Sequence, residues 1–128
     1  MAKILIVDDD AEFAQSVADV LGQKGYQTVF AANGNEGVAA AKREKPDLML
    51  LDVMMTTDSE GFEIARQLHK DPDTSHLPVI IITGVRRAKN LPFRFEPDED
   101  WLPVRAVLEK PVKPETLLAN VAKALGQG

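Results

Sequence analysis

Three unbroken runs of apolar residues constrain this chain more than any other feature of its sequence. The runs are Ile4–Val7, Leu48–Leu51 and Val79–Ile82. A strand with one face in water alternates between apolar and polar residues, so a continuous apolar run indicates a strand that is buried on both faces. Strands of this kind are typical of a parallel sheet that is covered by helices on both sides.

The segments around these runs supply the helices and two further strands. Apolar residues at helical spacing predict helices over residues 11–24, from about 34 to 44, over roughly 59–70, and from Pro114 onward. Asp10 is the expected N-cap of the first helix and Gly25 its C′ residue, while Asn33 and Glu36 have the form of a capping box. Two less continuous stretches predict the second and fifth strands, Tyr26–Ala31 and a short Ala106–Leu108. Alternating strands and helices favour an α/β fold with a parallel sheet.

Bulk composition excludes several classes of function. The 128 residues fit a single domain spanning 1–128, with no linker or second domain expected. A net charge of −5 argues against direct binding to nucleic acid or to an anionic membrane. The absence of cysteine excludes disulfides and thiolate chemistry. No run approaches the roughly 20 apolar residues that span a bilayer, and the N-terminal run is too short for a signal peptide, so we expect a cytoplasmic protein.

Polar side chains follow four of the predicted strands at the point where each strand ends. Asp8 and Asp9 follow the first strand, Asp52 the third, Thr83 the fourth and Lys110 the fifth. Each residue alone has an ordinary explanation, as a helix cap, a solvated loop acid, a β-former or a surface lysine. In a parallel sheet, however, all five lie at the same edge, where ligands of such folds bind.

The chemistry of these five residues indicates a metal-assisted phosphoryl acceptor. Three crowded carboxylates repel one another, and Mg²⁺, which prefers carboxylate oxygens, relieves that repulsion. Asp52 is then a candidate nucleophile, because carboxylates form aspartyl phosphates in other proteins. Lys110 would offset charge on the phosphoryl oxygens, and the hydroxyl of Thr83 could donate a hydrogen bond to one of them.

In this order the motifs closely resemble the receiver domain of two-component response regulators. The resemblance covers nearly the whole chain and rests on four stretches, Ile4–Asp9, Lys45–Asp52, Ile81–Gly84 and Lys110–Pro111. It implies a flavodoxin-like, doubly wound five-stranded parallel sheet in the order 2-1-3-4-5, with helices on both faces. It also implies phosphorylation of Asp52 by a sensor histidine kinase, a phosphotransfer protein or a small phosphodonor.

The same resemblance assigns roles to individual residues. Asp9, Asp52 and the backbone carbonyl of Met54 would ligate Mg²⁺, and Asp8 would act through water. Lys110 would bridge to the acid or phosphoryl group, ahead of a cis Lys110–Pro111 bond, and Thr83 would move inward on phosphorylation. No organic cofactor site is implied.

Three departures from the family pattern stand out. The loop after Asp52 is expected to be one residue longer than usual and lacks the Pro-Gly pair of the family. Val107 occupies a position where the family often has Tyr or Phe, so signal transmission is expected to differ. The segment 84–105 is punctuated by prolines, which disfavour a regular fourth helix, so this connection between the fourth and fifth strands is expected to be atypical. Its aromatic residues either anchor a partner or fix a long loop to the core.

Three functions fit this pattern of residues to different degrees. The first is a phosphorylation-controlled signalling switch that changes its binding to an unknown downstream protein or forms a homodimer, and that has no enzymatic activity beyond self-phosphorylation and autodephosphorylation. The second is a pseudo-receiver that serves as a constitutive docking module, which would normally lack part of the acid and lysine set. The third, a flavodoxin-like cofactor protein, is disfavoured because three aspartates after the first strand repel a nucleotide phosphate.

Overall fold

The computed structural model describes residues 2–52, 66–83, 104–109 and 112–126, of which Thr83 and most of 104–109 are described by their backbone alone. It contains a five-stranded parallel sheet in the order β2-β1-β3-β4-β5. This order confirms the predicted flavodoxin-like fold. The elements are β1 Lys3–Val7, α1 Ala11–Gln23, β2 Gln27–Ala31, α2 Gly34–Glu44, β3 Leu48–Asp52, β4 Val79–Thr83, β5 Val104–Glu109 and α4 Pro114–Ala124.

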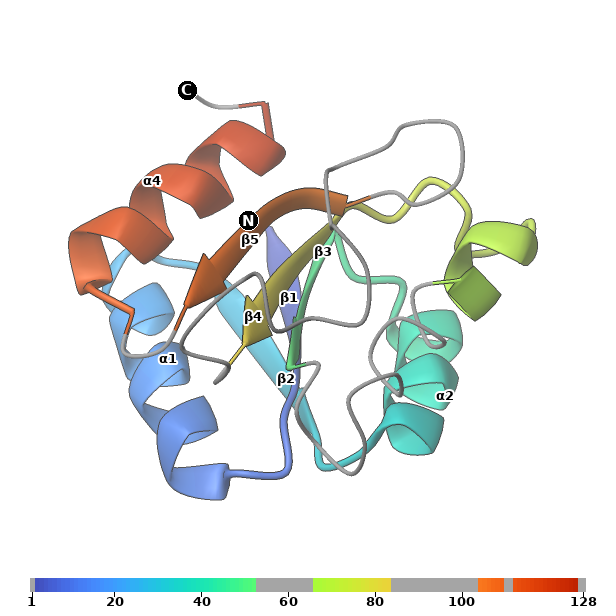
Figure 1. Cartoon of the computed structure of the whole chain (residues 1–128), viewed down its shortest axis with the longest axis horizontal. Coiled ribbons are helices and arrows are strands. Elements are labelled where there is room, and N and C mark those ends of the chain that lie inside the picture. The colour runs from blue at the N-terminus through green and yellow to red at the C-terminus, as the bar shows by residue number, and fades with distance from the viewer. Residues whose placement is uncertain (1, 53–65, 84–103, 110–111, 127–128) are drawn as a thin grey trace.

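Helices cover both faces of this sheet (Figure 1). Helices α1 and α4 lie on one side, and α2 lies on the other with the short helical stretch over residues 66–70. The predicted helix over 59–70 is thus present at its C-terminal end, and its first part falls outside the described residues. Most of the atypical 84–105 segment also lies outside them.

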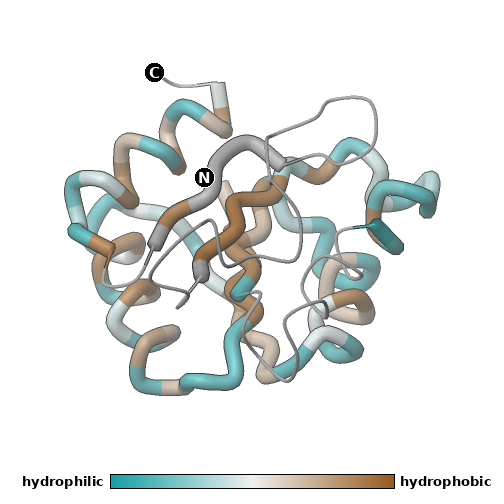
Figure 2. The backbone as a smooth tube through the Cα atoms, viewed as in Figure 1, coloured by the Kyte–Doolittle hydropathy of each residue, from teal (hydrophilic) through white to brown (hydrophobic). Residues whose placement is uncertain are grey.

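The buried strands send alternate side chains into two hydrophobic clusters. Leu5, Met49 and Ile81 pack with α2 on one face, whereas Ile4, Leu50 and Ile80 pack with α1 and α4 on the other. All six side chains are at most 1% exposed. Figure 2 shows the resulting band of hydrophobic strands between helices in which hydrophobic and hydrophilic residues alternate. This double burial is why the three runs contain no polar residue.

The helix ends follow the predicted capping chemistry. The Asp10 carboxylate accepts a hydrogen bond from the Phe13 N–H at 3.1 Å, and Gly25 adopts a φ of 88° just beyond the end of α1. Asn33 caps α2 by accepting from the Glu36 N–H at 2.9 Å. The return bond of the capping box differs slightly from expectation, because the Glu36 carboxylate accepts from Ala32 N–H, one residue before the cap.

The fifth strand is longer than its sequence suggested. The predicted strand over Ala106–Leu108 is present, but its predicted length was too short, since β5 runs from Val104 to Glu109. It pairs with β4 along the whole length of β4, with a register shift between Val79 and Ile80. The length of a strand at the edge of a sheet is set by backbone hydrogen bonds to the adjacent strand. The residues at the ends of such a strand need not be apolar. The apolar run therefore underestimated its length.

The parallel arrangement brings the carboxyl ends of β1, β3 and β4 to one edge. Val7 pairs with Leu51, and Asp52 pairs with Ile82. The residues that follow β1 therefore lie beside the end of β3. No helix within the described parts of the chain is both long and apolar enough to cross a membrane.

Candidate metal centre

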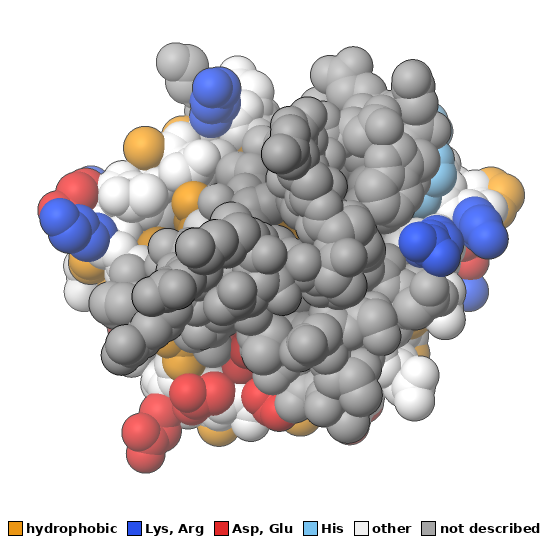
Figure 3. Space-filling view, viewed as in Figure 1, with side chains coloured by type: hydrophobic (Ala, Val, Ile, Leu, Met, Phe, Trp, Pro, Cys, Tyr) orange, Lys and Arg blue, Asp and Glu red, His pale blue; other side chains and the backbone are white. Residues whose placement is uncertain are grey.

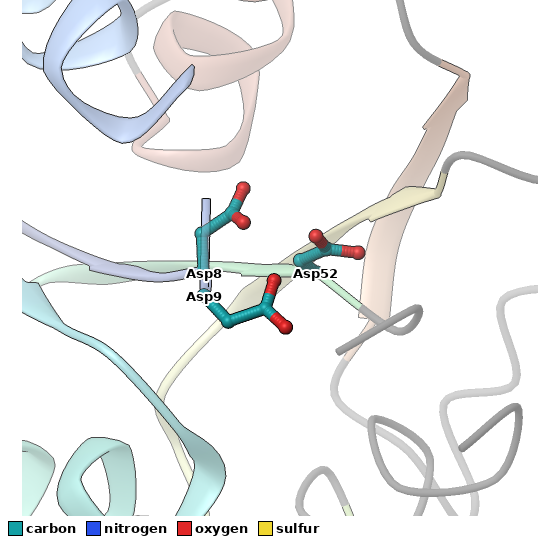
Figure 4. A group of neighbouring side chains, drawn as sticks. All are labelled: Asp8, Asp9 and Asp52. Carbon is teal, nitrogen blue, oxygen red and sulfur yellow. The ribbon is translucent and has the colours of Figure 1, made fainter. Parts of the chain in front are cut away.

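Three carboxylates converge at this edge of the sheet. Asp8 and Asp9 directly follow β1, and Asp52 is the last residue of β3. One oxygen of each carboxylate lies within 4.8 Å of the other two. Figure 4 shows the side chains of Asp8 and Asp9 leaning toward the side on which Asp52 lies. The convergence predicted from the strand ends is therefore present for these three acids.

The three acids differ in burial. Asp8 is 2% exposed and Asp52 is 3% exposed, whereas Asp9 is open to solvent. Asp8 and Asp52 are thus buried beneath the protein surface, whereas Asp9 lies on the solvent side of the group. Figure 3 shows further acidic side chains gathered at the lower edge of the molecule, near the start of α1. Asp10, the N-cap of α1, and Glu12 in its first turn are also exposed.

Backbone contacts fix the position of Asp8. Its N–H donates to the carbonyl of Ala31 at 3.0 Å, which continues the β1–β2 pairing by one residue. One oxygen of its carboxylate, Oδ1, accepts a hydrogen bond from the Asp10 N–H at 2.8 Å. The Asp8 side chain is therefore oriented by the turn that leads into α1.

Asp10 has a different task from its two neighbours. Its carboxylate oxygen Oδ1 accepts from the Phe13 N–H, and its carbonyl accepts from the Ala14 N–H at 3.0 Å. It belongs to the first turn of α1 and is not part of the three-carboxylate group. The tripeptide Asp8-Asp9-Asp10 thus divides into two acids that face Asp52 and one that caps a helix.

The donor set fits Mg²⁺. All three side chains offer hard oxygen atoms, which this ion prefers. The three carboxylate oxygens lie within 4.8 Å of one another, so small side-chain movements would bring them onto one ion. Three protein oxygens leave positions for water or for substrate oxygens, as is usual for Mg²⁺ sites that act on phosphates. The arrangement is chemically suited to hold a divalent ion beside a buried carboxylate.

The remaining predicted site residues are described in part or not at all. Thr83 ends β4 and pairs with Glu109, so the end of β4 lies beside the end of β5. Only the backbone of Thr83 is described. Lys110, Pro111 and Met54 lie outside the described residues, as does the loop after Asp52. Their roles remain predictions.

Comparison with known proteins shows the family of the chain. A match to the response regulator receiver domain covers residues 4–122. The chain is 41% identical to protein PilH of Pseudomonas aeruginosa, over 98% of both chains. It is 32% identical to the DNA-binding dual master transcriptional regulator RpaA of Synechocystis. That match covers 98% of this chain and 49% of the length of RpaA.

Solved structures show the same fold. A receiver domain protein from Clostridium thermocellum superposes with a TM-score of 0.82 at 26% identity, over 99% of this chain and 96% of that one. The receiver domain of a signal transduction histidine kinase from Syntrophus aciditrophicus superposes with a TM-score of 0.82 at 30% identity. The match covers 98% of this chain and 91% of that one. By family match, sequence identity and fold, the chain belongs to the response regulator receiver domain family.

Proposed function

We propose that this chain is a phosphorylation-controlled signalling switch in which Asp52 accepts a phosphoryl group in the presence of Mg²⁺. The observation that carries the proposal is the meeting of three carboxylate oxygens within 4.8 Å of one another, with Asp52 buried at the end of β3. In a receiver domain, that residue is the expected acceptor. A buried carboxylate in this position is not explained by packing, because burial of a charge is unfavourable unless other interactions compensate for it.

Each acid has a distinct proposed role. Asp9 and Asp52 are the direct Mg²⁺ ligands, joined by the carbonyl of Met54. Asp8 acts through a bridging water, which is consistent with the hydrogen bond that already occupies its Oδ1. Mg²⁺, when bound, offsets negative charge on the transferred phosphoryl oxygens.

The proposed reaction is a displacement at phosphorus. An oxygen of Asp52 forms a bond to phosphorus while the bond to the donor breaks, either the P–N bond of a phosphohistidine or the P–O bond of acetyl phosphate. Lys110 and Thr83 are proposed to contact the transferred group. Later attack by water restores the free carboxylate. Beyond this self-phosphorylation and its reversal, no metabolic activity is proposed.

Membership of the receiver family implies partners that supply the phosphoryl group, namely sensor kinases or phosphotransfer proteins. Output is proposed to pass through a downstream protein or through a phosphorylation-dependent homodimer in the cytoplasm. Direct binding to nucleic acid is not proposed, because a net charge of −5 is repelled by phosphate backbones.

Intact-mass measurement tests the proposal. The protein is incubated with Mg²⁺ and acetyl phosphate or phosphoramidate, and a mass increase of one phosphoryl group is expected for the wild type and for Asp47→Asn. Asp47 is an exposed acid next to the opposite end of β3, so this control makes the same substitution away from the site. No increase is expected for Asp52→Asn. Wild-type protein that stayed unmodified with every donor would instead favour a pseudo-receiver that acts as a docking module.

A further inference from the structure

The turn between β1 and α1 holds its acids through contacts at both ends. At the first end, the Asp8 N–H is tied to the Ala31 carbonyl of β2. At the second end, the Asp10 carboxylate and carbonyl accept hydrogen bonds from the N–H groups of Phe13 and Ala14 in α1. Asp9 lies between these two anchors. Its exposed side chain therefore depends on them for its direction.

The backbone of Asp10 also contacts the Asp8 side chain. The N–H of Asp10 donates to Asp8 Oδ1 at 2.8 Å. Asp10 has an extended backbone, with φ of −93° and ψ of 96°, and φ sets how its N–H points relative to α1. A capping side chain that fixes Asp10 on the helix therefore also fixes the peptide group that orients Asp8.

We infer that Asp10 is a positioning residue for the metal centre, acting through its cap on α1 to set the directions of Asp8 and Asp9. The inference rests on the proposed function. It assigns the third aspartate a role in Mg²⁺ affinity without making it a ligand. Its action requires the hydrogen-bonding oxygen of the side chain and does not require the negative charge.

Substitutions at Asp10 separate the cap from the charge. Asp10→Ala removes both, whereas Asp10→Ser and Asp10→Asn remove the charge and keep a good capping oxygen. Loss of contacts that orient metal ligands typically weakens metal binding about 10–100-fold. Because Asp10 acts one step further away, we expect Asp10→Ala to raise the Mg²⁺ dissociation constant about three- to tenfold. Asp10→Ser and Asp10→Asn should stay within about twofold of the wild type.

A matched cap elsewhere controls for general loss of stability. Asn33 caps α2 through the same kind of bond, from the N–H of Glu36, and it belongs to a different helix from the one that follows the three acids. Asn33→Ala should therefore destabilise the protein without changing the Mg²⁺ dissociation constant. Circular dichroism of each variant, recorded below its unfolding transition, confirms that the folded protein is being titrated.

The measurement is calorimetric titration of each protein with MgCl₂, together with hydrogen exchange of the Asp10 amide by NMR. The inference expects faster exchange and weaker binding in Asp10→Ala, with both restored in Asp10→Ser. Equal Mg²⁺ binding by Asp10→Ala and the wild type would overturn it. So would weak binding by all three Asp10 variants, which would show that only the charge matters. A wild type that bound no Mg²⁺ would overturn the proposed function as well as this inference.

Discussion

Gly37, in the first turns of α2, is a residue whose lack of a side chain is required by packing. A Cβ atom built there would lie 2.8 Å from Cγ2 and 3.0 Å from Cγ1 of Val7. Val7 is fully buried in β1, and Asp8 follows it directly. A β-branched side chain in such a place cannot rotate away freely. Close contact between α2 and β1 therefore depends on this glycine.

Substitution of Gly37 and of Gly22 by alanine should have opposite effects on stability. Alanine is favoured over glycine in a helix by about 1 kcal/mol, but overpacking a core costs about 1–3 kcal/mol. Gly37→Ala is therefore expected to lower the free energy of unfolding by up to about 2 kcal/mol. Gly22→Ala, where no atom from outside the local helix backbone lies within 4 Å of the new Cβ in the described parts of the chain, should raise it by about 0.5 kcal/mol.

Urea denaturation of the two variants measures these changes. The matched pair separates helix propensity from packing, because both substitutions place the same residue in a helix. If Gly37→Ala were as stable as the wild type, Val7 would have to shift to accommodate the methyl group. The explanation by close packing would then be wrong.

At the scale of elements, an ion pair joins α2 to the turn that follows residues 66–70. Lys42 Nζ lies 2.7 Å from Asp71 Oδ2. The hydrogen bond from Lys42 holds the pKa of Asp71 below its usual value, and a hydrogen bond from the Asp73 N–H adds to this effect. In return, the Asp71 carboxylate raises the pKa of Lys42. Both groups are solvent-accessible, so the pair is screened by salt.

The pKa shifts define the pH window in which this pair stabilises the fold. Asp71 contributes fully above its ordinary pKa of 3.8, and its contribution is lost as the pH falls through the lowered pKa. Lys42 contributes fully below 10.5, and its contribution is lost as the pH rises through the raised pKa. A double-mutant cycle with Lys42→Met and Asp71→Asn should therefore give a favourable coupling at neutral pH.

The same cycle checks the electrostatic origin of the coupling. Unfolding is followed at neutral pH and at about pH 3, with and without high salt. The coupling should decrease at the acidic pH and again on addition of salt. A coupling that did not respond to either change would contradict the proposed charge interaction and would point to packing of the two side chains.

At the scale of the whole molecule, the candidate metal centre is attached to the middle of the sheet. Asp8 and Asp52 extend from β1 and β3, which are neighbours and are covered by hydrophobic clusters on both faces. The three acids come together only when β1 and β3 are paired. Mg²⁺ that binds this group is therefore expected to bind the folded chain in preference to the unfolded one, and so to stabilise the entire domain.

Thermal unfolding in MgCl₂ and after chelation with EDTA measures this linkage. At a Mg²⁺ concentration ten times its dissociation constant, the expected stabilisation is about 1.4 kcal/mol. For a domain of this size, that free energy corresponds to a rise in Tm of about 4–7 °C. Asp52→Asn should lose most of the rise, whereas Asp47→Asn should keep it. Equal shifts in both variants would place the bound ion elsewhere on the protein.

Local sequence patterns were sufficient to predict the layers and most of the helix ends. Unbroken apolar runs identified β1, β3 and β4, because only strands covered on both faces exclude polar residues so completely. Asp10, Asn33 and Gly25 were identified as capping or C′ residues because these positions need a side-chain acceptor or a positive φ, which are local properties. The candidate acids followed from one topological rule about the carboxyl ends of parallel strands.

Features that depend on contacts between residues far apart in the sequence could not be predicted from local patterns. The length of β5 is set by pairing with β4, and the need for glycine at position 37 is set by Val7. The 4.8 Å grouping of the three acids results from the register between β1 and β3. The hydrogen bond from the Asp10 N–H to Asp8 is set by the direction of the turn between β1 and α1. Residue type reports local preference and burial, whereas these distances arise from the way separate segments pack together.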